Sequence, residues 1–135
     1  MKPRATLSIA LLFLFCLSLF SSSVLHGAAT ERTFHLDPAE TSSHAGQMAV
    51  VCGVVASAKY SETTGGSPTF LNLDHAYPDH VFTILIWGIH RSAFGQPEQT
   101  LAGKRICVSG RIEMYRGRPE IVAKVPSQIW LDAPK

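Results

Sequence analysis

The sequence predicts an all-β domain in which a few short strands close into a small barrel. Five segments rich in valine, isoleucine and aromatic residues alternate with turns that contain glycine or proline. At most one short helix fits between them. Five strands are too few for a typical sandwich, and closure removes the exposed edges that so small a sheet would otherwise have. The 135 residues are enough for one such domain.

Residues 1–29 have the three parts of a secretory signal peptide. Lys2 and Arg4 give a charged start, residues 7–20 are apolar, and small residues occupy positions 27–29. The apolar run is shorter than the roughly 20 residues of a membrane span. We therefore expect cleavage after Ala29 and a periplasmic or secreted protein. The alternative is an uncleaved segment, residues 7–25, that anchors the protein in a membrane.

Residues 30–45 are polar and without period, which predicts a flexible lead-in to a domain at 46–132. The five predicted strands are 48–58, 69–74, 81–87, 104–115 and 119–124. Gly53 and Gly110 fit positions where long strands must bend to serve both halves of a barrel. The short helix is expected within 90–103, and Gly117 supplies the positive φ of a tight turn before the fifth strand.

Alternation assigns the side chains of the second and third strands to two faces. The face predicted to point inward carries Leu71, Leu73, Phe82, Ile84 and Ile86. The outer face carries Phe70, Asn72, Thr83, Leu85 and Trp87. Aromatic rings beside an amide and a hydroxyl suit stacking on nucleic-acid bases or sugar rings. The alternative is that the helical turn, the lead-in or the tail covers Phe70 and Trp87.

The charge of the chain is balanced in total but uneven along its length. Lys2 and Arg4 account for the formal net charge of +2, so the chain without residues 1–29 is neutral. Residues 30–90 hold two basic and six acidic side chains, whereas residues 91–124 hold seven basic and three acidic ones. This asymmetry allows either a local basic patch or an ordinary solvated surface. Zero net charge argues against a dedicated DNA-coating protein.

Cysteine and histidine give no firm chemical signature. Cys52 and Cys107 remain after export, where they either form a disulfide or stay as two buried thiols. His75, Asp79 and His80 fall in one turn without the spacing of a zinc site. Neither a nucleophile–base motif nor a phosphate-binding loop is recognisable. We expect no metal, no cofactor and no enzymatic activity.

Four segments resemble a known family: 67–73 (SPTFLNL), 82–87 (FTILIW), 103–112 (GKRICVSGRI) and 115–121 (YRGRPEI). In order and spacing they are similar to the bacterial OB-fold nucleic-acid-binding family of the tRNA-anticodon and helicase type, here in an exported, stand-alone form. The resemblance implies a five-stranded Greek-key barrel. It implies that Phe70 stacks on a base, that Thr83 contacts bases, and that the hairpin with Tyr115, Arg116 and Arg118 clamps the ligand.

The resulting functional hypothesis is an exported module that binds single-stranded nucleic acid without catalysis. Its expected binding residues are Phe70, Asn72, Thr83, Trp87, Arg111, Tyr115, Arg116 and Arg118. Stacking would supply affinity that tolerates any sequence, and the arginines would neutralise phosphates. The alternative is an envelope module that binds a protein or a glycan through the same surface, with the basic hairpin incidental. A small hydrolase has only fold analogy behind it.

Overall fold

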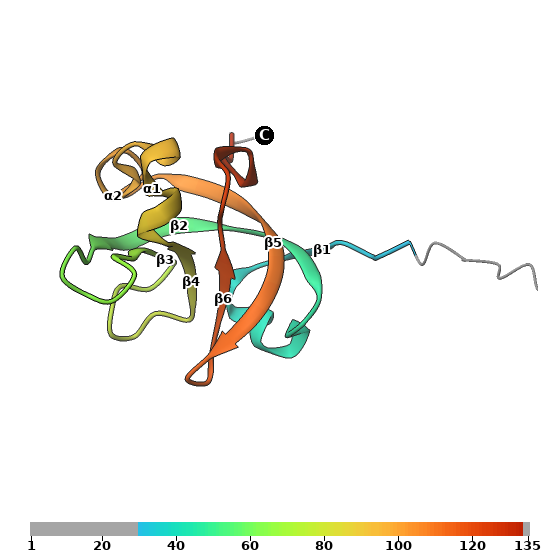
Figure 1. Cartoon of the computed structure of the whole chain (residues 1–135). Coiled ribbons are helices and arrows are strands. Elements are labelled where there is room, and N and C mark those ends of the chain that lie inside the picture. Colours follow the sequence, from blue (N-terminus) through green and yellow to red (C-terminus); the bar gives the residue numbers. More distant parts are fainter. Residues whose placement is uncertain (1–29, 134–135) are drawn as a thin grey trace, which may run out of the picture.

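The structure, a computed structural model, describes residues 30–133 of the chain (Figure 1). Its elements, in chain order, are β1 (Phe34–Leu36), the 3-10 helix η1 (Pro38–His44), β2 (Met48–Tyr60), β3 (Thr69–Leu73), β4 (Phe82–Ile86), α1 (Gly88–Phe94), α2 (Pro97–Thr100), β5 (Arg105–Tyr115), β6 (Arg118–Val122), η2 (Pro126–Gln128) and β7 (Ile129–Leu131). The predicted all-β class is confirmed, because strands dominate and every helix is short. The predicted signal peptide lies outside the described residues.

The strand pairings close a ring of five strands in the order β2-β3-β4-β6-β5, with β5 returning to β2. The antiparallel pairs are β2–β3, β3–β4, β5–β6 and β2–β5, and β4 runs parallel to β6. The flanking strand β1 lies parallel to β2, and β7 lies antiparallel to β5. An OB-like all-β arrangement agrees with this order.

Strand β2 has two partners, and its backbone bends where the partner changes. Its first half, from Met48 to Val54, pairs with β5, and its second half, from Val55 to Tyr60, pairs with β3. The register shifts between Val55 and Ser57. At Gly53, just before the shift, a Cβ atom would lie 2.8 Å from Oδ1 of Asp74. The bend therefore needs a residue without a side chain.

The second predicted bend, at Gly110 in β5, has a similar cause. A Cβ atom there would lie 2.6 Å from Cγ2 of Ile121 in β6, well inside van der Waals contact. Glycine allows the backbone of β5 to approach β6 as the sheet curls. Both glycines thus lie where the strands of the ring approach other parts of the chain most closely.

One apolar core fills the ring. The side chains predicted to point inward from β3 and β4 are fully buried, which confirms the assignment of faces for Leu71, Leu73, Phe82, Ile84 and Ile86. The other strands of the ring contribute the buried residues Ala49, Val51, Val55, Ile106, Val108, Ile112 and Ile121. Burial of these aliphatic and aromatic groups is the main favourable contribution to folding.

The structure contains more regular elements than the sequence predicts. Residues 30–45, predicted as a lead-in, include β1 and η1, and η1 buries Pro38 and Thr41. The hydroxyl of Thr41 donates to the carbonyl of Pro38 at 2.7 Å. Sequence periodicity could not reveal β1 or β7, because each has three residues and depends on a neighbouring strand for its hydrogen bonds.

Two short helices connect β4 to β5, where at most one was expected. Gly95, with a φ of 73°, ends α1, and Pro97 opens α2 at a position where its missing N–H costs nothing. The two helices lie together at one end of the ring (Figure 1). None of the helices between residues 30 and 133 has the length and apolar character needed to cross a membrane.

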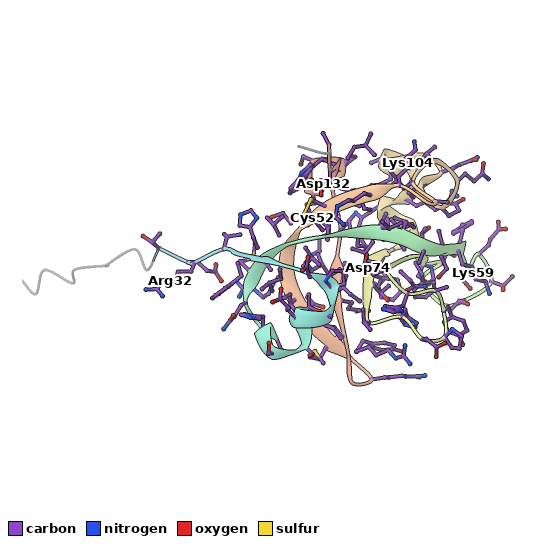
Figure 2. The ribbon with its side chains drawn as sticks, turned by 180° about the vertical axis from the view of Figure 1, so that it is seen from behind. Arg32, Cys52, Lys59, Asp74, Lys104 and Asp132 are labelled. Atoms are coloured by element: carbon purple, nitrogen blue, oxygen red, sulfur yellow. A yellow bond between two sulfur atoms is a disulfide. The ribbon has the colours of Figure 1, made fainter. Side chains whose placement is uncertain are left out.

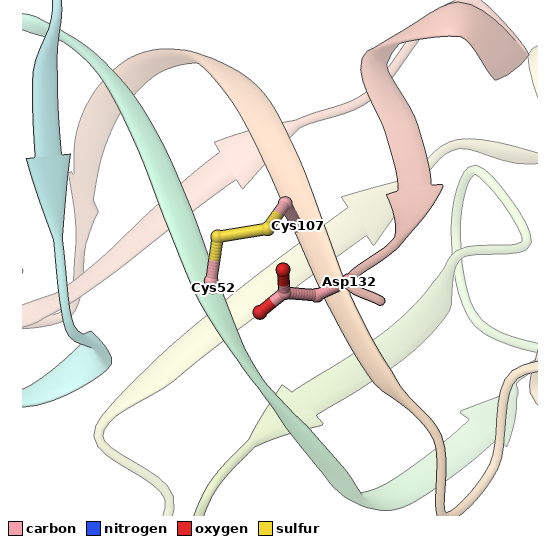
Figure 3. A group of neighbouring side chains, drawn as sticks. All are labelled: Cys52, Cys107 and Asp132. Carbon is pink, nitrogen blue, oxygen red and sulfur yellow. A yellow bond between two sulfur atoms is a disulfide. The ribbon is translucent and has the colours of Figure 1, made fainter. Parts of the chain in front are cut away.

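A disulfide joins Cys52 and Cys107, which face each other directly across β2 and β5. Figure 3 shows the carboxylate of Asp132 beside it. Three potential metal-ligand side chains thus meet, and they are the one such group among residues 30–133. The sulfurs, however, are bonded to each other, and Asp132 pairs with Nε of Arg105 at 2.8 Å. The cluster is therefore a cross-link beside an ion pair.

We predict that replacing both cysteines with alanine lowers the free energy of unfolding by about 2–4 kcal/mol, because the bond closes a long loop in the unfolded chain. The sequence separation across the bond is 55 residues. Thermal unfolding with and without a reductant measures the effect. The wild type should lose stability on reduction, while the double variant should not respond. Equal midpoints for the two proteins in oxidising buffer would contradict the prediction.

Candidate binding groove

A hollow on the outer face of the ring encloses about 550 Å³. Strands β2, β3, β4 and β6 form its floor. The loop 75–80, between β3 and β4, and the turn of the β5–β6 hairpin form its walls. Figure 1 shows this loop and this hairpin at the lower side of the ring. We call this hollow the groove.

Three aromatic side chains line the groove. Phe70 is half-buried on β3, opposite Leu85 of β4, whereas Tyr77 on the loop and Tyr115 at the end of β5 are 74% and 57% exposed. A smaller hollow adjoins the groove and shares Phe70 and Tyr115 with it. The two hollows together therefore present flat apolar surfaces that solvent can reach over a continuous stretch.

Trp87 lies at the far end of the smaller hollow, and one side of its ring is covered. A Cβ atom on Gly66 would lie 2.8 Å from the indole, so the loop 61–68 packs closely against it. The amide of Gly88 also donates to the carbonyl of Gly66 at 2.8 Å. Trp87 nevertheless stays 38% exposed. The loop 61–68 thus covers part of the predicted aromatic face.

Hydrogen bonds between side chains fix the floor of the groove. Thr83 Oγ1 donates to Oδ1 of Asn72 at 2.8 Å, and Nδ2 of Asn72 donates to Oγ of Ser57 at 3.0 Å. The amide of Tyr77 donates to the same Ser57 oxygen at 3.0 Å. Asn72 and Thr83 are each only 6% exposed. These two predicted ligand contacts are thus held by each other, and through Ser57 they orient the loop that carries Tyr77.

Two of the predicted phosphate-binding arginines have partners within the protein. Arg111 does not line the groove, and its guanidinium pairs with Glu31 at 2.7 Å and also donates to the carbonyl of Gly46. Arg118 lines the groove, but its Nη1 donates to the carbonyls of Pro78 and His80 at 2.8 and 2.7 Å. Arg118 therefore ties the hairpin to the loop 75–80.

Two further cations lie at the groove without such partners. Arg116 and Lys59 make no side-chain hydrogen bond or ion pair within residues 30–133, and both line the groove. The guanidinium carbon of Arg116 lies 5.3 Å from the ring centroid of Tyr115. Figure 2 shows Lys59 near one end of β2, on the side of the domain opposite Arg32. These two side chains can meet an anionic group on a ligand.

A carboxylate and an imidazole complete the lining. Burial raises the pKa of Glu120, and Glu113, directly opposite on β5, raises it further by repulsion. Burial lowers the pKa of His80 and the charge of Arg118 lowers it further, while Pro78 and Asp79 act weakly in the opposite sense. Glu120 lies in both hollows, beside Phe70 and Tyr115. The groove thus contains a negative charge amid its aromatic and basic side chains.

Six of the eight predicted binding residues line the groove: Phe70, Asn72, Thr83, Tyr115, Arg116 and Arg118. Trp87, also predicted there, lines the adjoining smaller hollow, and Arg111 lines neither. Sequence reasoning missed Ser57, Lys59, Tyr77, His80 and Glu120, which also line the groove. Glu120 carried a usable signal, since it lies on a predicted strand, whereas Lys59 lies on β2 just beyond the predicted end of that strand. Tyr77 and His80 carried no such signal, because the sequence of a loop between two strands does not show which face of the sheet the loop will fold against.

Comparisons with known proteins agree with the fold and do not assign a family. No known family model matches the sequence, and no curated protein matches it. Similar solved structures include a chain assigned as an aspartyl-tRNA synthetase from Leishmania major Friedlin, with a TM-score of 0.52 and 12% identity over 79% of this chain and 22% of that one. An OBody, AM1L10, bound to hen egg-white lysozyme has a TM-score of 0.48 and 20% identity, over 70% and 87% of the two chains.

The aspartyl-tRNA synthetase from Entamoeba histolytica has a TM-score of 0.46 and 16% identity, over 66% of this chain and 19% of that one. The present chain therefore spans about a fifth of the length of the two synthetase chains. One of these three structures exceeds a TM-score of 0.5, and at 12% identity it establishes a likeness of fold. Residues 30–133 thus share an OB-like all-β fold with part of a larger enzyme.

Proposed function

We propose that this protein is an OB-type five-stranded barrel that binds single-stranded nucleic acid in the groove. The observation that carries the proposal is the grouping of Phe70, Tyr77 and Tyr115 around one hollow with Lys59 and Arg116. Aromatic rings stack on bases of any sequence, and nearby cations meet the phosphates. A synthetase that shares the fold is, by its name, a protein that acts on a nucleic acid.

We propose that the groove binds its ligand without changing it. The hydroxyl of Thr83 donates to Asn72, and the hydroxyl of Ser57 accepts from Asn72 and from the amide of Tyr77. Neither hydroxyl is therefore paired with a general base, as an activated nucleophile would be. The polar floor serves to hold the walls in place.

We also propose that the protein is exported to the periplasm or the medium. The charged start, apolar run and small residues of positions 1–29 are typical of a signal peptide. The Cys52–Cys107 disulfide supports the same proposal, because such bonds persist in oxidising compartments and are rare in the cytosol.

Replacing Phe70 with alanine should weaken binding of a labelled single-stranded oligonucleotide by about 1–3 kcal/mol, the usual contribution of one stacked base. Fluorescence anisotropy measures the affinity, and thermal unfolding checks that the variant is folded. Trp130→Ala is the matched control, since Trp130 is an exposed aromatic that lies on β7 and lines neither hollow. Unchanged affinity of a folded Phe70→Ala variant would remove Phe70 from the site.

Salt should weaken this binding only moderately. With Lys59 and Arg116 as the two cations that meet phosphates, the logarithm of the affinity should fall with the logarithm of salt at a slope of about −1.4. Arg116→Gln should reduce that slope by about half. A slope several times steeper would mean that the strand follows a larger basic surface. No binding at low salt would show that nucleic acid is the wrong class of partner.

A second candidate ligand is a neutral glycan of the envelope, and Glu120 is the observation that favours it. A carboxylate beside aromatic rings repels phosphates, whereas it accepts hydrogen bonds from sugar hydroxyls. An envelope protein could use the same surface, but no feature of the groove favours it specifically.

Glu120→Gln separates the two ligands. At neutral pH it should strengthen binding of nucleic acid by about two- to fivefold, because it removes a partly screened negative charge. As the pH falls toward the raised pKa of Glu120, the wild-type side chain takes up a proton and the ratio of the two affinities should approach one. Titration of both proteins with the oligonucleotide at several pH values tests this. Weaker binding by the variant would point to a ligand that donates hydrogen bonds to the carboxylate.

A further inference from the structure

One side chain of β6 ties the loop 75–80 to the β5–β6 hairpin. Arg118, the first residue of β6, directs Nη1 at the carbonyls of Pro78 and His80 and at Nδ1 of His80, which lies 3.0 Å away. The ring of Tyr77 stacks on that of His80, with 5.6 Å between centroids and 22° between planes. The position of Tyr77 in the wall therefore depends on where His80 lies.

The contact between Arg118 and His80 suits a neutral imidazole, whose Nδ1 shares the two hydrogens of Nη1 with the carbonyls of Pro78 and His80. A guanidinium nitrogen has hydrogens and no available lone pair, so Nδ1 of His80 can only accept from it. A neutral imidazole that accepts at Nδ1 carries its proton on Nε2. A second proton, on Nδ1, would point an N–H at another N–H and place two positive charges side by side.

We propose that Arg118 and His80 form a pH-dependent latch, which holds the loop 75–80 at the groove when His80 is neutral and releases it when His80 is protonated. The carbonyl of Pro78 provides the alternative partner. Arg118 donates to it in the closed latch, and a protonated Nδ1 would compete for it. Release frees the loop end that carries Tyr77, while the bond from the Tyr77 amide to Ser57 remains as the inner attachment.

The surroundings of His80 lower its pKa in net effect. The charged groups that act on the imidazole are Arg118 from β6 and Asp79 from the loop itself. Burial and Arg118 lower the pKa of His80 below its ordinary 6.5, and they outweigh the opposing effects of Pro78 and Asp79. The closed latch is therefore complete at neutral pH and is lost as the pH falls through this lowered value.

The latch is a property of the ligand-free protein. Its consequence for a ligand, loss of the Tyr77 wall in acid, rests on the proposed function. The test therefore uses no ligand, so that a failure of nucleic-acid binding and a failure of the latch are separate results.

The experiment is an NMR titration of the purified protein from pH 8 to pH 5, combined with hydrogen exchange of the Asp79 amide. We expect His80 to have a pKa below 6.5 and to carry its proton on Nε2 at high pH. After correction for intrinsic rates, exchange of the Asp79 amide, which donates to the carbonyl of Ala76, should be about tenfold faster once His80 is protonated, whereas the Tyr77 amide keeps its bond to Ser57.

Variants assign the effect to the two latch residues. Arg118→Gln should raise the pKa of His80 and give fast exchange already at neutral pH. His80→Gln should make exchange of the loop independent of pH. Arg116→Gln is the matched control, because it removes a cation of the same turn that does not contact the loop carbonyls, and it should leave both readouts unchanged.

The latch is wrong if His80 titrates at or above 6.5, if its proton lies on Nδ1 at neutral pH, or if loop exchange in the wild type does not depend on its titration. It is also wrong if Arg116→Gln reproduces the effect of Arg118→Gln, since the charge of the turn alone would then be responsible. Thermal unfolding confirms that each variant is folded.

Discussion

The structure depends on one constraint, which is that β2 must be hydrogen-bonded to two different strands along its length. If β2 paired with β5 or β3 alone, the five strands would form an open sheet with exposed edges, and the core would have one uncovered face. The change of partner near Val55 forces the chain to bend sharply, and Gly53 permits the close approach that this bend requires. Gly110 has the corresponding role in β5, where the ring returns to β6.

The closed ring determines where a ligand can bind. The inner faces of β3 and β4 are filled by aliphatic and aromatic side chains, so the ligand has only the outer face and the loops around it. On that face Thr83, Asn72 and Ser57 hold one another in a chain of hydrogen bonds. Such a floor does not rearrange readily, because each of its polar groups would lose a partner in a partly dry setting.

Much of the fold could be predicted because the alternation of apolar and polar residues along each strand shows which side chains face the core. Alternation in β3 and β4 placed Leu71, Leu73 and Phe82 in the core, and it placed Phe70 and Thr83 together on the outer face, where the structure has them. Short elements escaped prediction. A three-residue strand such as β1 exists because β2 is beside it, and that neighbour is not visible in the sequence of β1 itself.

The candidate groove was harder to predict because its members are far apart in the chain. The composition of the hairpin correctly indicated basic side chains, but not which partners they have. Arg111 pairs with Glu31, and Arg118 binds carbonyls of the loop 75–80, so both depend on long-range contacts. A count of arginines cannot separate a cation that is available to a ligand from one already used by the fold.

The fixed floor and the separate walls have a consequence for how such a protein can change over time. Tyr77, Trp87 and Tyr115 are presented by loops and strand ends around the groove, while the disulfide and the ring lie behind them. Substitutions or insertions in the loops 61–68 and 75–80 can therefore alter the shape of the recognition surface without disturbing the core. One scaffold of this kind can acquire new ligands by drift in its loops, so that lineages with the same ring diverge in what they recognise.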